Sequence, residues 1–340
     1  MRGVAFTGNC NIEFIDVPDP TPGPGDVVIE IKASGMCGSD LHVYRAPRQE
    51  TKSKVIRGHE PCGVVVAIGP SITGCDLKIG ARVMVHHYHG CTVCPHCRSG
   101  WPQMCCDVPV IVYGSDDHGA HAPYMKAPAD TLVRLDERLS FAAGAAISCG
   151  TGTAWGAFER MGLTGRDTVA IFGQGPVGLS ATLLAKALGA RVIALDIDDN
   201  RLARAKSFGA DVVINSRDEN VPEAVRDVTG GRGAGMVLET AGAAKAADDA
   251  LRSASAWGTI GLVGIGAELK FPLGEFLRRQ LRIIPSWTMS IQGQRACAEF
   301  VVERGLDLDA LFTDRWSLDQ AQVAYETFNR QSGGKGVFLL

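Results

Sequence analysis

The chain has 340 residues, of which 46% are hydrophobic and 21% are charged. This length exceeds what one ordinary core accommodates, so we expect about two domains, and the composition indicates a globular protein. The formal net charge of -3 argues against a nucleic-acid or anionic membrane surface, because neither attracts a mildly acidic protein. The composition therefore favours chemistry on a small molecule.

Targeting and redox signals predict a cytoplasmic protein without a membrane partner. The first residues, MRGVAFTGNCNIE, contain no apolar run of the length that a signal peptide requires. The uncharged stretch 141–158 approaches transmembrane length, but it is mostly Gly, Ala, Ser and Thr, and we expect it to be buried in protein. Eleven cysteines, several at metal-ligand spacing, are a poor framework for disulfides and fit a reducing compartment.

The N-terminal part of the chain is rich in strand signals. In residues 17–35 a Pro/Gly-rich turn leads into a β-branched run, and further strand-like runs follow at 63–69 and 81–87. Gly, Ser, Asp and Pro turns bound these runs. The pattern predicts a compact all-β domain up to about residue 140.

From residue 168 onwards, strands and helices alternate. Residues 168–172 and 191–196 are typical of buried strands, and helical patterns follow at 176–190 and 200–210. DVVIN, MVLET and TIGLVGI are further short apolar strands. This alternation predicts a doubly wound α/β domain, a parallel sheet with helices on both faces, over 150–284. The chain ends in the strand-like GVFLL, so we expect 285–340 to return to the first domain, 1–149.

A glycine-rich turn links the first strand and helix of the α/β domain. Gly173, Gly175 and Gly178 have the G-x-G-x-x-G spacing, and the next strand ends in Asp196. Such glycines let a pyrophosphate approach the helix N-terminus, and the acidic residue accepts hydrogen bonds from ribose hydroxyls. We therefore predict NAD rather than NADP, because Asp196 would repel a 2′-phosphate and Arg201 is the only close positive charge. The alternative is a glycine-rich turn without a cofactor.

Four cysteines lie close together in residues 91–105. Cys91, Cys94, Cys97 and Cys105 form C-x2-C-x2-C-x7-C, the spacing of a closed tetrahedral zinc site. A closed site has no open position for a substrate, so we predict a structural zinc that orders this loop. A zinc-ribbon nucleic-acid module is the alternative, but Arg98 is the only firmly positive residue in the loop.

Nearly the whole chain resembles the zinc-dependent medium-chain alcohol dehydrogenases. The matching stretches are GMCGSDLH at 35–42, GHEPCGVVVAIG at 58–69, the cysteine quartet, SCGTGT at 148–153 and FGQGPVGL at 172–179. The resemblance implies a GroES-like β-rich catalytic domain with a Rossmann domain, a second zinc that is catalytic, and NAD-dependent oxidation of an alcohol to an aldehyde or ketone. It also implies a homo-oligomer, either a tetramer or a dimer.

The resemblance assigns roles to individual residues. It implies that Cys37, His59 and Cys149 hold the catalytic zinc, and that Glu60 is a second-shell carboxylate or an exchanging ligand of the same metal. Proton transfer would involve Ser39 and then His42, while Asp40 orients His59. The implied cofactor contacts are Gly173, Gly175, Pro176, Val177, Gly178, Asp196, Thr153, Arg201, Val263 and Ile265. Cys149 stands where many polyol and threonine dehydrogenases carry Glu, so those activities, or a non-catalytic relative, are alternatives.

One histidine suggests the kind of substrate. In the predicted strand 81–87, alternation would place Val83, Val85 and His87 on one face. The position of His87 resembles one that lines the substrate pocket of the family, so we predict a substrate with polar groups beyond the reacting hydroxyl. The alternative is a hydrogen-bonded histidine cluster beside the zinc loop. His118 and His121 are not expected to have a direct role.

Overall fold

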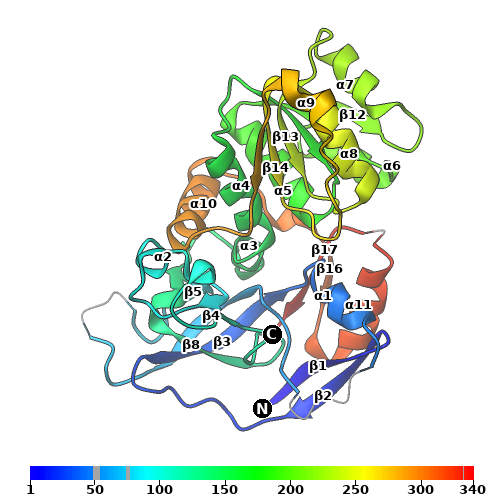
Figure 1. Cartoon of the computed structure of the whole chain (residues 1–340). Helices are drawn as coiled ribbons and strands as arrows, with labels where there is room; N and C mark the ends of the chain where they lie inside the picture. The colour runs from blue at the N-terminus through cyan, green and yellow to red at the C-terminus, as the bar shows by residue number, and fades with distance from the viewer. Residues whose placement is uncertain (49–53, 74–76, 332) are drawn as a thin grey trace. The chain divides into compact units, whose positions relative to one another are not determined.

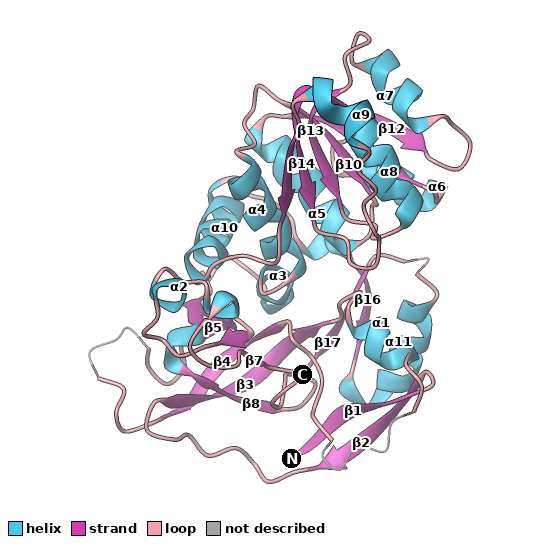
Figure 2. Cartoon of the chain, in the orientation of Figure 1, coloured by secondary structure: helices cyan, strands magenta, loops and turns pink. Residues whose placement is uncertain are grey.

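The computed structural model describes residues 1–48, 54–73, 77–331 and 333–340 (Figures 1 and 2). The chain divides into two compact units. Unit 1 comprises Met1–Gly152 and Ser290–Leu340, and unit 2 comprises Thr153–Met289. Within the described residues, no helix is long and apolar enough to cross a membrane. The uncharged stretch 141–158 is buried along most of its length, as predicted.

Unit 2 is a six-stranded parallel sheet with the strand order β12-β11-β10-β13-β14-β15. Its strands are β10 (Thr168–Phe172), β11 (Arg191–Asp196), β12 (Val212–Asn215), β13 (Ala234–Glu239), β14 (Ala254–Leu262) and β15 (Arg282–Pro285). Its helices are α5 (Pro176–Leu188), α6 (Asp199–Ser207), α7 (Val221–Val228), α8 (Ala244–Ser253) and α9 (Leu273–Phe276). The predicted doubly wound domain is confirmed, and the strand order reverses between β10 and β13, where such folds bind ligands.

Local sequence explains why α5 begins and ends where it does. Pro176 occupies the first turn, where its missing N–H removes no helical bond. Gly189 ends the helix in the left-handed conformation with φ 94°, which glycine adopts without steric strain. On the sheet side, the strands bury their apolar side chains in one core that includes Phe172, Ile193 and Val237.

Unit 1 is built on the long strand β3 (Asp26–Gly35). Its seven-stranded sheet has the order β16-β17-β3-β4-β5-β9, and β8 also pairs with β3. The other strands of the sheet are β4 (Pro61–Ile68), β5 (Arg82–Val85), β8 (Tyr124–Pro128), β9 (Leu132–Arg134), β16 (Phe312–Trp316) and β17 (Lys335–Leu339). Two further two-stranded sheets belong to unit 1: the hairpin of β1 (Arg2–Gly8) with β2 (Asn11–Asp16), and β6 (Tyr88–His89) with β7 (Ile111–Val112), which flank the cysteine loop.

Short helices connect the strands of unit 1. They are α1 (Asp40–Arg45), α2 (Pro95–Arg98), α3 (Phe141–Ile147), α10 (Ile291–Glu303) and α11 (Ala321–Asn329), while α4 (Gly150–Met161) starts in unit 1 and continues into unit 2. Single 3-10 turns lie at Pro102–Met104, Ala129–Thr131, Leu277–Arg279, Asp309–Leu311 and Leu318–Gln320. Helices α1 and α11 contribute to one apolar cluster that includes Tyr44, Tyr325 and Phe338.

The C-terminal strand returns to the start of the chain. β17 pairs antiparallel with β3, so that Val337 lies opposite Gly35 and Phe338 opposite Ser34. The C-terminal strand-like segment thus forms β17 and pairs with the N-terminal strand β3. This pairing also brings Lys335 close to the turn that follows β3, because the amide of Met36 donates to the carbonyl oxygen of Gly336 over 3.0 Å.

Candidate active site

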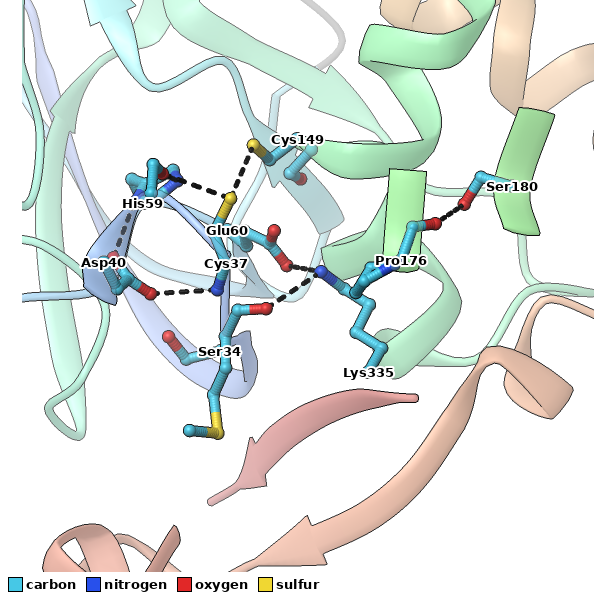
Figure 3. Close-up of polar contacts among 12 residues, drawn as sticks. Ser34, Cys37, Asp40, His59, Glu60, Cys149, Pro176, Ser180 and Lys335 are labelled. Carbon is cyan, nitrogen blue, oxygen red and sulfur yellow. Dashed lines mark hydrogen bonds and ion pairs between the residues drawn. The ribbon is translucent and has the colours of Figure 1, made fainter. Parts of the chain in front are cut away.

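Four predicted metal ligands converge in unit 1. Cys37 lies between β3 and α1, His59 and Glu60 precede β4, and Cys149 lies between α3 and α4. Their ligand atoms all lie within 4.8 Å of one another, and the two sulfur atoms are 3.9 Å apart (Figure 3). Two sulfurs each about 2.3 Å from one tetrahedral zinc ion stand roughly 3.8 Å apart. The donor set therefore fits zinc in both chemistry and spacing.

Asp40 orients the two ligands nearest to it. Its Oδ1 lies 3.2 Å from Nδ1 of His59, and its Oδ2 accepts a 2.9 Å hydrogen bond from the amide of Cys37 (Figure 3). With Nδ1 occupied, Nε2 of His59 is left for a metal. The hydroxyl of Ser39 lies 3.3 Å from that Nε2 and 3.2 Å from the sulfur of Cys37. Ser39 is thus beside two of the four donors.

Glu60 is fully buried against an equally buried lysine. Nζ of Lys335 lies 2.5 Å from Oε2 of Glu60 and donates to the carbonyl oxygen of Met36 over 3.2 Å (Figure 3). Burial raises the pKa of Glu60, and the positive charge of Lys335 opposes that shift. Sequence reasoning missed Lys335, because a lysine that follows two glycines is typical of an exposed turn.

His87 lies next to the ligand cluster but outside the predicted strand. β5 ends at Val85, and the chain bends at His87. The prediction that alternation continues to His87 is therefore wrong. The His87 ring is nevertheless buried, with its centroid 5.0 Å from that of His59. Its Nδ1 lies 3.2 Å from the carbonyl oxygen of Ser148.

The contact with Ser148 determines the tautomer of His87. A carbonyl oxygen only accepts, so Nδ1 of His87 carries the proton and donates it. Burial lowers the pKa of His87, and the ring is neutral at physiological pH. Its Nε2 is then a hydrogen-bond acceptor. Nε2 has no hydrogen-bond partner among the residues that the structure describes.

His42, His118 and His121 differ in burial and in their contacts. His42 is exposed on α1, and within the described chain its side chain makes no hydrogen bond to Ser39. His118 accepts the amide of Ile56 over 3.1 Å, which is a structural contact. His121, for which no direct role was expected, is fully buried and hydrogen-bonded on both ring nitrogens.

The cysteine quartet forms a second cluster. The sulfurs of Cys91, Cys94, Cys97 and Cys105 lie within 4.8 Å of one another, and those of Cys91 and Cys97 are 3.9 Å apart. Backbone amides point at the sulfurs, for example from Cys97 to Cys94 over 3.5 Å, and this amide lowers the pKa of the Cys94 thiol. The neighbouring Cys106 is exposed, and it is not in the cluster. The donor set fits a closed zinc site.

The glycine-rich turn of unit 2 lies between β10 and α5. A β-carbon on Gly178 would stand 1.8 Å from the carbonyl oxygen of Gly173, so close packing of the turn requires Gly178. A β-carbon on Gly175 would meet no atom of the described residues within 4 Å, apart from its two chain neighbours. Packing within the protein therefore does not explain Gly175, whereas the close approach of a ligand does.

Asp196 is held at the end of β11 beside this turn. Its Oδ2 accepts the amide of Gln174 over 2.6 Å, and its Oδ1 accepts the amide of Ile197 over 2.8 Å. Arg201 lies 3.7 Å from Oδ2. Because carboxyl ends of parallel strands share one edge, Val263 and Ile265, which follow β14, lie on the same edge of the sheet. Pro176 and Val177 form the first turn of α5, and Thr153 lies in α4.

Comparison with known proteins identifies the family. Residues 23–137 match the alcohol dehydrogenase GroES-like domain, and residues 176–303 match the zinc-binding dehydrogenase domain. An uncharacterised zinc-type alcohol dehydrogenase-like protein of Escherichia coli is 38% identical over 99% of this chain and 98% of its own length. Sorbitol dehydrogenase of Bacillus subtilis is 34% identical over 96% of this chain and 93% of its own.

A solved structure agrees with these matches. Alcohol dehydrogenase from a Thermus species superposes with a TM-score of 0.89 at 30% identity, covering 100% of this chain and 99% of its own. The chain therefore belongs to the zinc-dependent medium-chain alcohol dehydrogenases and is an oxidoreductase of that family. The predicted family and the predicted fold, a GroES-like domain with a Rossmann domain, are both confirmed.

Proposed function

We propose that this protein oxidises an alcohol with at least one further hydroxyl group to an aldehyde or ketone, using NAD and a catalytic zinc. The convergence of Cys37, His59, Glu60 and Cys149 within 4.8 Å carries this proposal. Zinc bound there would lower the pKa of an alcohol hydroxyl to near neutrality. Cys37, His59 and Cys149 are the proposed ligands, with Glu60 adjacent.

The surrounding residues handle the proton. The Ser39 hydroxyl, beside both Nε2 of His59 and the Cys37 sulfur, would hydrogen-bond the reacting oxygen and take its proton while it passes its own hydroxyl proton onward. His42 delivers that proton to solvent, a role that its exposure on α1 supports. Since no side-chain hydrogen bond joins Ser39 to His42 in the described part of the chain, a further group carries the proton between them. Asp40 keeps His59 in the tautomer that presents Nε2.

NAD is the proposed hydride acceptor. The open space beside Gly175 and the N-terminus of α5 suit a pyrophosphate. Three amides hold the Asp196 carboxylate, which stays available to accept ribose hydroxyls and would repel a 2′-phosphate. We propose further cofactor contacts from Pro176, Val177, Gly178, Thr153, Arg201, Val263 and Ile265.

The position of His87 supports the proposal that the substrate carries a further hydroxyl group. Its Nε2 is an acceptor in a buried position beside His59, so it pairs with a substrate O–H donor. A hydroxy acid would instead place a carboxylate against a nitrogen lone pair. A simple alcohol would leave Nε2 unpaired, which costs about 1–3 kcal/mol. The similarity to a sorbitol dehydrogenase agrees with a polyhydroxy substrate.

The direct test is an assay of NADH formation with matched substrates. We expect turnover of a vicinal diol to exceed that of a simple primary alcohol and a 2-hydroxy acid of equal carbon number. In His87→Phe, the kcat/KM ratio of diol to simple alcohol should fall roughly 5- to 150-fold. His89→Phe is the control, because His89 is half-buried and lies near Asp130 instead. Absence of NADH with every alcohol, or an unchanged ratio, would contradict the proposal.

Three further features of the protein are part of the proposal. The cysteine quartet holds a second, structural zinc, which its closed donor set supports. The protein assembles as a homo-oligomer, a tetramer or a dimer, supported by the open edge of β15 and by the exposed Leu273 and Leu277 in unit 2. It resides in the cytoplasm, where its described cysteines, which are free thiols, remain reduced.

A further inference from the structure

A buried chain of hydrogen bonds leads from His59 to the C-terminal helix. Beyond Asp40, the Tyr325 hydroxyl lies 3.0 Å from Oδ2 of Asp40. Nε2 of His121 lies 2.7 Å from that hydroxyl, and the Ser34 hydroxyl lies 2.7 Å from Nδ1 of His121. The Asp40–His59 end of this chain is visible in Figure 3. Residues from β3, α1, α11 and the segment before β8 are thus joined to one proposed metal ligand.

Only one arrangement of protons satisfies every contact of a neutral His121. The Asp40 carboxylate accepts only, so the Tyr325 hydroxyl must donate to it. The Tyr325 oxygen is then free to accept, so Nε2 of His121 carries the proton. Its Nδ1 is therefore bare and accepts from the Ser34 hydroxyl. All the hydrogen bonds therefore donate in one direction, from Ser34 toward Asp40. Burial lowers the pKa of His121 to about 4, which keeps the ring neutral.

Apolar packing holds this chain in place. Ser34, His121 and Tyr325 are each fully buried. The Tyr325 ring meets Phe6 edge-on with centroids 4.7 Å apart, and the His121 ring meets Phe338 edge-on at 4.8 Å. Because bulk water does not reach these groups, a lost hydrogen bond would not be replaced by solvent.

We propose that Tyr325 and His121 are positioning residues for the catalytic zinc, acting through Asp40 to hold His59 in its metal-binding orientation. This proposal rests on the proposed role of His59 as a zinc ligand. Tyr325 supplies one of three donors to Asp40, the others being the Cys37 amide and Nδ1 of His59. Without it, the carboxylate is held by its two metal-ligand partners alone and is freer to rotate away from them.

The test measures zinc release from the purified holoprotein into excess chromogenic chelator. The Cys37→Ser variant identifies which phase of release belongs to the catalytic site. Tyr325→Phe should release that zinc about tenfold faster than the wild type, and the absorption of cobalt bound at the same site should shift. Tyr44→Phe is the matched control, because Tyr44 is equally buried in the same cluster, 5.5 Å from Tyr325, and its hydroxyl does not contact Asp40.

A double-mutant cycle asks whether Tyr325 acts through Asp40. In an Asp40→Asn background, adding Tyr325→Phe should change the release rate by less than about twofold. Equal effects in both backgrounds would overturn the proposal. If no phase of zinc release from the wild type is lost in Cys37→Ser, the proposed function itself is refuted. If the wild type shows this phase and Tyr325→Phe releases the zinc at the same rate, only the positioning role is refuted.

Variants of His121 provide a second route if Tyr325→Phe does not fold. His121→Gln keeps an N–H that can donate to Tyr325, whereas His121→Leu removes it. We expect fast zinc release from the Leu variant and release near the wild-type rate from the Gln variant. Equal release rates from the two variants would overturn the proposal.

Discussion

Lys335 and Glu60 are charged side chains that face each other with almost no exposure to solvent. A buried pair gains little over an apolar pair, because desolvation offsets much of the Coulomb attraction, but removing one partner strands the other charge. The Lys335 ammonium is also hydrogen-bonded to the Met36 carbonyl. Its removal would therefore destabilise the protein mainly by leaving the Glu60 charge buried without a partner. The same ion pair keeps the Glu60 carboxylate beside the proposed metal ligands.

We predict that Lys335→Met lowers the free energy of unfolding by about 3–5 kcal/mol. Adding Glu60→Gln should recover a large part of that loss, because no uncompensated carboxylate remains. Urea unfolding in zinc-containing buffer measures both effects. Lys32→Met is the control, since Lys32 pairs with Glu30 over 2.6 Å at the surface, and its loss should cost less than about 1 kcal/mol. Equal losses for Lys335→Met and Lys32→Met would contradict this account.

At the scale of elements, two glycines at the turn between β10 and α5 have different roles: Gly178 is required for packing, and Gly175 is proposed to make room for a ligand. Gly175→Ala should leave the melting temperature unchanged, because the new β-carbon meets no protein atom. The dissociation constant for NAD should nevertheless rise about tenfold or more, roughly 1.4 kcal/mol, because the methyl group occupies the space proposed for the pyrophosphate. Gly235→Ala, also free of nearby atoms but on β13, should change neither quantity. Unaltered NAD affinity in Gly175→Ala would place the cofactor elsewhere.

The cysteine loop is a second element whose order depends on its proposed ligand. Cys97→Ser should release one zinc per chain and lower the melting temperature, because the short helix α2 and its flanking turns contain little apolar core of their own. Cys106→Ser should retain both metals, since Cys106 lies outside the cluster. Metal analysis of the two purified variants, with calorimetry, makes the comparison. Identical zinc content in both would refute the structural site.

At the scale of the whole molecule, unit 2 presents an open sheet edge. In the part of the chain that the structure describes, β15 pairs with β14 alone, and natural proteins cover or blunt such edges. Exposed Leu273 and Leu277 lie in the segment before β15. Covering these groups with a second copy would remove both the unpaired backbone and the apolar surface from water.

Sedimentation analysis should accordingly give a mass of two or four chains. Leu277→Asp should shift the distribution toward smaller species, whereas Val323→Asp, at an exposed apolar position on α11, should not. A monomer mass for the wild type at micromolar concentration would exclude the proposed assembly.

The sequence by itself determined the features whose parts lie close together along the chain. The glycine turn with α5 and β11, and the four cysteines of the loop, are sets of residues separated by a few positions, so local spacing suffices to predict them. The alternation of apolar segments also determined the doubly wound sheet, because buried parallel strands and amphipathic helices leave distinct patterns. Family motifs added the convergence of Cys37, His59 and Cys149.

Only the tertiary structure decided which distant side chains support that site. Lys335 reaches Glu60 because β17 pairs with β3, and Tyr325 reaches Asp40 because α11 packs beside α1 in one apolar cluster. His87 lies outside its predicted strand because β5 ends at Val85 and the chain bends at His87. No spacing pattern in the sequence predicts such supporting roles for a lysine, a tyrosine or a histidine. Their chemistry depends on burial and on partners that remote strands and helices contribute.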